Sequence, residues 1–508
     1  MITKIRTVAF VGMKPIEIIV EAQISPGISS FSIVGLPDKA VGEAKERIRS
    51  TFFQIGLSFP SKRVVVNMAP ADIPKSGSHY DLPIALSILG AMDVIDANML
   101  DNTISIGELG LDGNLSYVFG TICAAMLANE NGFSIICPKQ CEKEALWSGN
   151  NSIIAAKSIL SIINHLKGIS QITASEDNLL KRKDFEYDID ICEVYGQNVA
   201  KRALEIAACG GHNVLMIGSP GSGKSMLAER AKTILPELSP EESLETTCIY
   251  SMAGMAPENG LVYIPPFRAP HSSSSLISIV GGGADAKPGE LSLSHNGILF
   301  LDEFPEFPRS IIESLRQPLE TNNITISRAK EHITYPANIQ LIAAMNPCKC
   351  GFFGNADKEC LKAPKCALEY RNRISGPILD RFDIVVYMSN IKASNLFENE
   401  KRERSKEIKD RIKIVRDTQI QRANKNSIVK FKLNGKIQNN FLNSITKLDS
   451  DSKAFFQKAV EHSNLSARGC HKILRVARTI ADMETSENVL KHHVLEALQY
   501  KLLDIKGT

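Results

Sequence analysis

The sequence has no long apolar run and no targeting segment at its start. None of its 508 positions begins a stretch of about 20 consecutive apolar residues, which excludes an ordinary membrane-spanning helix. Residues 1–4 lead directly into alternating, strand-like sequence rather than into a cationic and apolar signal segment. We therefore expect a cytoplasmic protein with no membrane partner.

The chain also lacks a strong excess of charge. Its 59 Lys and Arg residues face 56 Asp and Glu, and the net charge of +3 is too small to indicate nucleic-acid binding by itself. Any contact with DNA would need a local basic patch. The 11 cysteines are scattered except in one place, which favours a reducing cytosol over a disulfide framework.

What the sequence does contain is a complete phosphate-binding motif. It lies between an apolar, strand-like run at 213–217 and a helical stretch that starts near Met226. A strand, a glycine loop and a helix N-terminus together direct backbone N–H groups at a triphosphate. Lys224 is predicted to reach the β- and γ-phosphates, and Ser225 to bind Mg²⁺. The nucleotide-contacting residues are predicted to be Gly218, Ser219, Pro220, Gly221, Ser222, Gly223, Lys224, Ser225 and Met226.

Two further apolar runs end in residues that suit ATP hydrolysis. The run at 298–301 ends in Asp302 and Glu303, as a buried parallel strand delivering two carboxylates would. Asp302 is predicted to hold Mg²⁺, and Glu303 to orient and deprotonate the attacking water. The run at 339–345 ends at Asn346, whose amide is expected beside the γ-phosphate as a sensor. These residues predict an ATPase.

Four segments of different character follow one another. Residues 1–168 predict an α+β domain, 169–188 a polar linker, 189–390 an α/β nucleotide-binding domain, and 391–508 a helical domain. The elements expected within them are strands at 16–22 and 63–68, helices at 41–53 and 82–92, a charged and solvated helix at 399–422, and a final helix pair at 468–483 and 489–503.

The phosphate loop, Asp302 and Glu303, Asn346 and Pro377–Asp383 follow one another in this order along the chain. This succession of motifs resembles that of AAA+ ATPases. More specifically, the chain resembles the magnesium-chelatase-related ComM/YifB family of bacterial competence proteins. The resemblance covers nearly the whole chain. It implies a Lon-protease-like N-terminal domain, an AAA+ P-loop domain with a parallel sheet, and a C-terminal helical lid. The other strings that carry it are 31–38, 66–72, 267–272, 281–283, 288–290 and 477–482.

The resemblance also assigns roles to residues outside the phosphate loop. It implies a ring of subunits, a hexamer, in which each ATP site is shared between neighbours. Arg381 then matches the arginine finger, and Arg468, in the lid, matches the second sensor. Val194 and Tyr195 are expected to flank the adenine.

The family implies a DNA helicase or translocase, a motor that promotes branch migration or strand exchange during homologous recombination of incoming DNA in natural transformation. A magnesium-chelatase-like remodeller of a partner protein remains the alternative. The fused N-terminal domain and the cysteine cluster count against it, because the chelatase ATPase lacks both.

Two insertions are expected to line the pore of such a ring. One spans 255–290 and contains Arg268. The other, 324–335, alternates apolar and polar residues around a short turn, which predicts a β-hairpin with Arg328 and Lys330 near its tip. Basic residues at a hairpin tip suit contacts with the phosphate backbone that carry no sequence information. A solvated hairpin is the alternative interpretation.

Four cysteines, Cys348, Cys350, Cys360 and Cys366, lie within 19 positions. In a cytosolic protein, thiolates gathered in this way most naturally bind a tetrahedral Zn²⁺. Free buried thiols are the alternative. The predicted metal site forms an insertion, 348–366, between the sensor Asn346 and the finger Arg381.

The Lon-like resemblance does not extend to a protease dyad. The family's serine would fall within 81–85, where this chain has Ile84, and the lysine region 118–124 contains no lysine. Without a hydroxyl nucleophile or an amine base, acyl transfer cannot start. We expect no proteolysis, and an assembly or DNA-guiding role for this domain.

Overall fold

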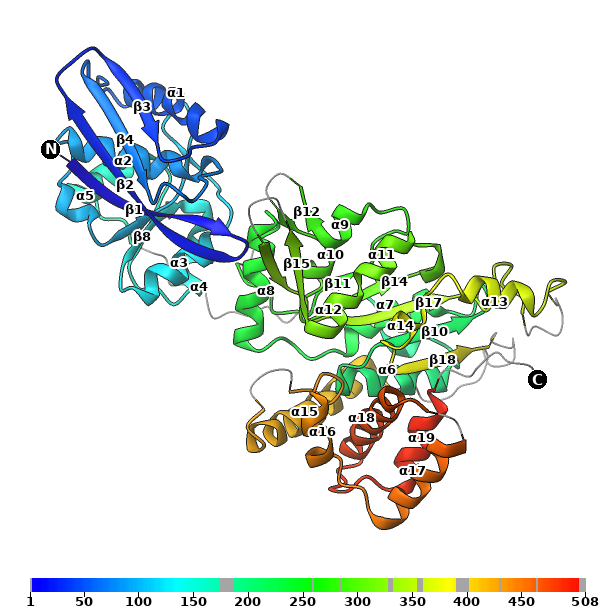
Figure 1. The fold of residues 1–508 in the computed structure, drawn as a ribbon. Helices are drawn as coiled ribbons and strands as arrows, with labels where there is room; N and C mark the ends of the chain where they lie inside the picture. The colour runs from blue at the N-terminus through cyan, green and yellow to red at the C-terminus, as the bar shows by residue number, and fades with distance from the viewer. Residues whose placement is uncertain are drawn as a thin grey trace.

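The computed structural model describes residues 2–173, 187–257, 260–283, 286–327, 332–353, 360–389, 402–428, 432–462 and 465–501. An N-terminal part, a central part and a group of C-terminal helices follow one another along the chain (Figure 1). The mixed α/β architecture with a parallel sheet and a helical C-terminus is confirmed. None of the helices in the described ranges is long and apolar enough to cross a bilayer.

The N-terminal part is built on a seven-stranded mixed sheet with the order β3-β4-β2-β1-β5-β8-β9. Its long antiparallel hairpin joins β1 (Ile2–Val11) to β2 (Lys14–Ser25), and alternate residues of both strands are buried, as a strand period of two requires. The other strands are β3 (Ser30–Val34), β4 (Arg63–Ala69), β5 (Thr103–Ser105), β8 (Ser134–Pro138) and β9 (Ile153–Ala156). The helices are α1 (Lys39–Gln54), α2 (Asp81–Ala91), α3 (Thr121–Glu130), α4 (Glu142–Trp147) and α5 (Ile159–Leu166).

The central part holds a five-stranded sheet in which every neighbouring pair is parallel. Its strand order is β11-β14-β17-β10-β18, and its longer strands are almost wholly buried because helices cover both faces. All carboxyl ends therefore meet at one edge, where such sheets bind ligands. The strands are β10 (Val214–Gly218), β11 (Phe267–Arg268), β14 (Ile298–Leu301), β17 (Gln340–Met345) and β18 (Ile384–Met388).

Helices and two small hairpins surround this sheet. The predicted hairpin exists as β15 (Asn323–Ser327) paired antiparallel with β16 (His332–Pro336). A shorter pair joins β12 (Gly281–Gly282) to β13 (Lys287–Pro288). The helices are α6 (Asn198–Gly210), α7 (Lys224–Arg230), α8 (Pro240–Met252), α9 (Leu276–Val280), α10 (Glu290–Leu293), α11 (Arg309–Ser314), α12 (Arg316–Thr321), α13 (Lys365–Arg371) and α14 (Gly376–Leu379).

The C-terminal helices share one hydrophobic core with the central sheet, so they pack on it rather than forming a separate body. The charged run forms a helix, α15, only from Ser405, and the final helix ends at Gln499, before the expected 503. The helices are α15 (Ser405–Lys425), α16 (Asn439–Ile445), α17 (Ser450–His462), α18 (Ala467–Met483) and α19 (Lys491–Gln499).

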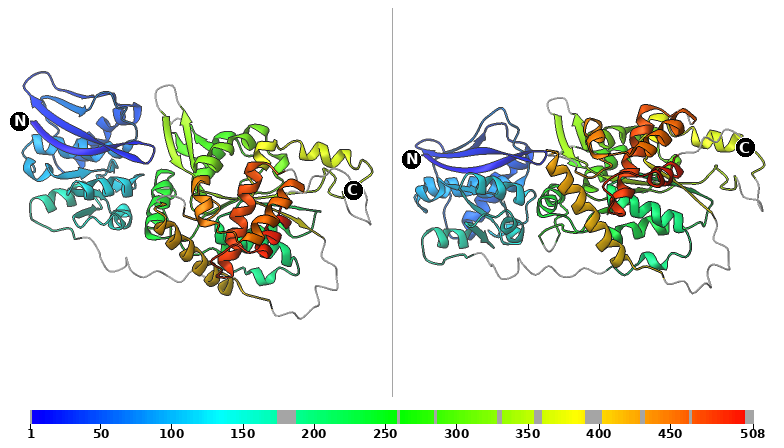
Figure 2. Two further views of the ribbon diagram at one scale, coloured as in Figure 1. Left: turned by 60° about the horizontal axis from the view of Figure 1, so that its bottom comes forward. Right: turned by 90° about the horizontal axis from the view of Figure 1, so that it is seen from below.

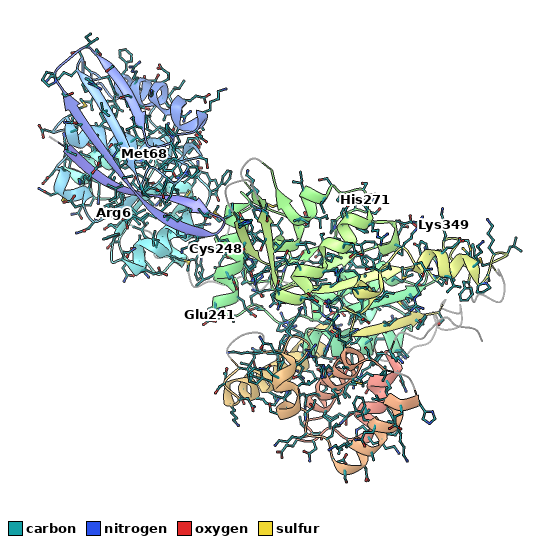
Figure 3. All side chains as sticks on the ribbon, in the orientation of Figure 1. Arg6, Met68, Glu241, Cys248, His271 and Lys349 are labelled. Carbon is teal, nitrogen blue, oxygen red and sulfur yellow. The ribbon has the colours of Figure 1, made fainter. Side chains whose placement is uncertain are left out.

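The N-terminal part contacts the central part through α3 and α8. Cys248 of α8 packs in a small apolar cluster with Ile122 and Cys123 of α3, and it faces the N-terminal part in Figure 3. Both views of Figure 2 show the hairpin β15–β16 on the side of the central part that faces β1 and β2. The predicted linker lies mostly outside the described residues.

Candidate nucleotide-binding and hydrolysis site

The phosphate loop follows β10 and ends where α7 begins, at Lys224. Gly221 and Gly223 have φ values of +81° and +88°, which only glycine adopts without strain. The Lys224 ammonium donates to the carbonyl oxygens of Gly218 and Ser219 at 2.7 and 3.0 Å. Burial lowers the pKa of Lys224, although the nearby carboxylates of the site oppose this shift. The loop is thus folded around a lysine placed to receive phosphate.

The two predicted Mg²⁺ ligands touch one another. Ser225 Oγ, at the start of α7, donates to Asp302 Oδ2 at 2.5 Å, although the two residues come from different strand–helix connections. Hydroxyl and carboxylate oxygens are the protein ligands that Mg²⁺ takes beside phosphate, so these residues fit the ion. Glu303 has φ +50°, a left-handed conformation that is uncommon outside glycine and occurs at functional sites.

The strand before the predicted sensor, β17, reaches the same edge of the sheet. Asn346 follows β17, and its Oδ1 accepts from the Lys224 ammonium at 3.2 Å. The predicted phosphate, metal and sensor residues therefore converge from three adjacent parallel strands. An acid, a hydroxyl, an amide and an ammonium gathered there can bind a Mg²⁺-triphosphate and position a water for attack.

Arg381 lies at the other edge of the sheet. It precedes β18, whose first residue, Ile384, pairs with Val214 at the start of β10. Its carbonyl oxygen accepts from the side chain of Asn213, immediately before β10, at 2.9 Å. The phosphate loop leaves from the far end of β10, about 13 Å away at ~3.3 Å per residue. The backbone of Arg381 therefore lies at the edge of the sheet opposite the phosphate loop of the same chain.

Arg381 belongs to a group of arginines at this second edge. It is ion-paired with Glu320 of α12. Burial, together with the positive charges of Arg468 and Arg316, lowers the pKa of Arg381. Lys472, one turn after Arg468 on α18, donates to the carbonyl of Phe382 at 3.2 Å. Arg381 and Arg468 were predicted separately as finger and sensor, and in the fold the charge of Arg468 acts on Arg381; the two roles stay predictions.

The predicted adenine-flanking residues begin the central part. Val194 is buried, and the guanidinium of Arg402 lies 3.9 Å from the centre of the Tyr195 ring. Sequence reasoning missed Gln197, whose side-chain amide donates to the carbonyls of Ser222 and Ser389 at 3.1 and 2.7 Å. The signal was its place directly after Tyr195 and Gly196, in the string that opens this part of the chain.

The four clustered cysteines come together in space. Their Sγ atoms all lie within 4.8 Å of one another, including that of Cys366. A tetrahedron of sulfurs around one Zn²⁺ has edges of about 3.8 Å, given Zn–S bonds of ~2.3 Å. The backbone N–H of Phe353 also donates to Cys348 Sγ at 3.3 Å. The donor set therefore fits a metal ion, and the adjacent Lys349 marks its position in Figure 3.

Of the three residues predicted to contact DNA, the structure describes only Arg268. Arg328 and Lys330 lie outside the described residues. Arg268 makes a two-bond pair with Glu290, at 2.6 and 2.7 Å, and this pair raises the pKa of Arg268. A phosphate group would have to compete with that carboxylate, so Arg268 remains a prediction as a DNA contact.

The fold and the site together define a P-loop ATPase of the AAA+ type. Family models for subunit ChlI of magnesium chelatase match residues 20–141 and 190–396, and the model for the C-terminal part of that subunit matches 402–501. The chain belongs to the magnesium-chelatase-related ComM/YifB family.

The relatives that show this cover nearly the whole chain. The uncharacterized protein YifB of Escherichia coli is 39% identical over 98% of this chain and 97% of its own length. The competence protein ComM of Haemophilus influenzae is 38% identical over 97% of this chain and 96% of its own length. A shorter match, 26% identical over 38% of this chain and 20% of its own length, is to the DNA replication licensing factor Mcm2 of Drosophila melanogaster.

Proposed function

We propose that this protein is an ATP-driven ring motor that acts on DNA and serves strand exchange or branch migration in homologous recombination. The carrying observation is the division of the hydrolysis machinery between two edges of one sheet. Lys224, Ser225, Asp302 and Asn346 gather at one edge, and Arg381 stands at the other. Such a division is useful only if subunits share their sites.

Within one site the residues have separate tasks. Lys224 binds the β- and γ-phosphates, and Asn346, already in contact with it, senses the γ-phosphate. Mg²⁺, when held by Ser225 and Asp302, neutralises charge on the phosphate oxygens. Glu303 takes the proton of the attacking water.

The neighbouring subunit completes the site. Arg381 and Arg468 of one subunit reach the nucleotide of the next, after the pair of Arg381 with Glu320 opens. An arginine supplied in this way stabilises charge developing on the transferred phosphoryl group and is worth ~10³–10⁵-fold in rate. A closed ring, a hexamer in this proposal, repeats the same heterologous contact around its axis.

Contact with DNA is supported by the relatives and by the hairpin. The relative from Haemophilus influenzae is named a competence protein, and the Drosophila relative a DNA replication licensing factor. Arg328 and Lys330 fall between β15 and β16, in the hairpin proposed to line the pore. Because one relative is named a competence protein, we take the DNA that enters during natural transformation as the proposed substrate.

The test is ATP turnover by the purified protein with single-stranded, duplex and branched DNA. We expect stimulation by DNA that is lost in the Arg328→Ala/Lys330→Ala double variant. The matched control is Lys453→Ala/Lys458→Ala, which removes two charges from the exposed face of α17 and should keep the stimulation. Turnover indifferent to every DNA would overturn the DNA part of the proposal.

A second candidate function is favoured by the matched family models, which describe a magnesium chelatase subunit. The protein would then use ATP to remodel a partner protein. Turnover that ignores DNA but rises with a co-purifying protein would support this candidate.

Zinc is the metal proposed for the cysteine cluster, since four thiolates prefer it to the harder cations. It would hold the loop after Asn346 against the phosphate loop, because Gly351 packs on Pro220. Elemental analysis of the full chain should find one zinc per subunit, and a chain free of zinc yet fully active would contradict the assignment.

A further inference from the structure

Asp383 is a buried carboxylate that the proposed chemistry does not use. Its side chain is only 9% exposed, and the imidazole of His212 beside it is fully buried, with Nδ1 at 3.5 Å from Asp383 Oδ2. Burial would raise the pKa of Asp383, but His212, Lys472 and Arg475 outweigh it and hold that pKa below its usual value. The carboxylate is therefore ionised in the fold, and a buried charge is kept only where partners satisfy it.

A further partner, Asn213, fixes the backbone around Asp383 and Arg381. The N–H of Asn213 donates to Asp383 Oδ2 at 3.3 Å, and the carbonyl of Asn213 accepts the N–H groups of Asp383 and Ile384, both at 3.1 Å. The side-chain amide of Asn213 binds the Arg381 carbonyl and also accepts from Leu341 N at 2.9 Å. The backbone at Arg381 is thus connected by hydrogen bonds through Asn213 to β10 and to β17.

The same group reaches the C-terminal helices. His212 Nε2 lies 2.8 Å from Thr479 Oγ1 on α18. Two glycines leave room for this imidazole, since a Cβ at Gly210 or Gly435 would stand 2.3 or 2.9 Å from its ring nitrogens. The imidazole therefore has one position, between the finger segment and α18.

We propose that Asp383, held by His212 and Asn213, is a positioning residue: it fixes the position and orientation of Arg381 relative to the neighbouring subunit. This inference rests on the proposed function, in which Arg381 acts between subunits. Misplacing a reacting group by about 1 Å can cost ~10²-fold in rate. Asp383 lies at the edge of the sheet opposite the phosphate loop, so we expect its effect on turnover to pass through the segment that carries Arg381.

The test is Asp383→Asn, which keeps the shape and removes the charge. We expect turnover to fall about 10- to 100-fold while the KM for ATP stays within about twofold, because the phosphate loop of each subunit is intact. In rings mixed with Glu303→Gln subunits, activity should recover, because the intact Arg381 of a Glu303→Gln subunit serves the intact site of an Asp383→Asn subunit. A fold that is merely damaged would not be rescued.

Two control variants distinguish a failure of this inference from a failure of the proposal that subunits share their ATP sites. Asp380→Asn, in the same segment but with a carboxylate 54% exposed, should keep turnover near wild type. Arg381→Ala must also be rescued by Glu303→Gln; if it is not, the sharing of sites between subunits fails. If Arg381→Ala is rescued but Asp383→Asn is fully active, or is inactive without rescue, Asp383 has no positioning role.

A second variant covers the case in which Asp383→Asn does not fold. Thr479→Val nearly conserves volume and removes the hydroxyl that contacts His212 and that also bonds the Asn434 amide and the Arg475 carbonyl. It should give the same loss of turnover at unchanged KM, smaller in size, with the same rescue in mixed rings. Wild-type turnover in Thr479→Val, together with an insoluble Asp383→Asn, would assign the group to stability alone and overturn the inference.

Discussion

The residues predicted to act at the carboxyl edge of the sheet are expected to make different contributions. Lys224→Ala should abolish nucleotide binding, because the buried ammonium is the cation of the phosphate loop.

Glu303→Gln should bind ATP with little change but lose about 10²–10⁴-fold in turnover, the usual contribution of a general base. Turnover assays beside titration with a fluorescent nucleotide separate the two effects. Glu306→Gln, three residues on and paired with Arg373, is the control, and retained turnover in Glu303→Gln would exclude Glu303 as the base.

A second prediction at this scale concerns acid stability. His79 is buried and lies 2.9 Å from the Val8 carbonyl, and burial lowers its pKa to about 4 against the opposing effect of that carbonyl. Between that value and an unfolded pKa of 6.5 the unfolded chain binds more protons than the folded one. The contribution of His79 to stability, about 3 kcal/mol, is therefore complete above pH 6.5 and lost as the pH falls through 4.

Urea unfolding followed by tryptophan fluorescence measures this effect, since the single tryptophan, Trp147, lies in the N-terminal part. Wild-type protein should lose more stability than His79→Gln between pH 7 and pH 4.5. His271→Gln, at an exposed position, should follow the wild type. Equal losses in wild type and His79→Gln would contradict the prediction.

At the scale of elements, the loop after Asn346 that carries Cys348 and Cys350 lies against the phosphate loop, because Gly351 contacts Pro220. A Cβ at Gly351 would lie 2.6 Å from Pro220 Cδ, and the φ of +83° adds strain. Gly351→Ala should therefore raise the Kd for ATP by about 5- to 150-fold, from an overpacking cost of about 1–3 kcal/mol.

The metal content of Gly351→Ala should stay unchanged, whereas Cys348→Ser/Cys350→Ser should lose the metal. Gly376→Ala, where a Cβ meets nothing within 4 Å, is the control for the ATP measurement. Equal ATP affinity in Gly351→Ala and wild type would show that the loop contact has no influence on the nucleotide.

The elements also show which features could be predicted from sequence. The phosphate loop, the strand before Asp302 and the β15–β16 hairpin were predicted because each depends on local patterning over a few residues. The pair of Arg381 with Glu320 and the contact of His212 with Asp383 were not. His212 and Asp383 lie 171 positions apart, and only the packing of β18 beside β10 brings them together. Such contacts leave no periodicity in the chain.

At the scale of the whole molecule, the ATPase contacts its neighbours in the fold through polar groups as well as apolar ones. Two C-terminal helix contacts are polar: Thr479 of α18 contacts His212, and Lys472 of α18 donates to the carbonyl of Phe382, next to Arg381. The N-terminal part meets α8 through a buried network: Ser251 Oγ donates to Glu144 Oε2 at 2.6 Å and accepts the N–H of Gly120 at 3.0 Å. Burial raises the pKa of Glu144, although Ser251 and Tyr117 oppose the shift.

This network predicts how the N-terminal part separates from the ATPase. Ser251→Ala leaves the Gly120 N–H and one oxygen of Glu144 buried without their partner, a loss of about 1–3 kcal/mol at the interface. Calorimetry should then show the unfolding of the N-terminal part as a separate, earlier transition, and proteases should cut between the two parts faster. Ser243→Ala, on the same helix, is the control, since its buried hydroxyl has no partner among the described residues and its loss costs little. A single unchanged transition in Ser251→Ala would mean that the remaining contacts between the two parts, including the apolar packing around Cys248, are enough to hold them together.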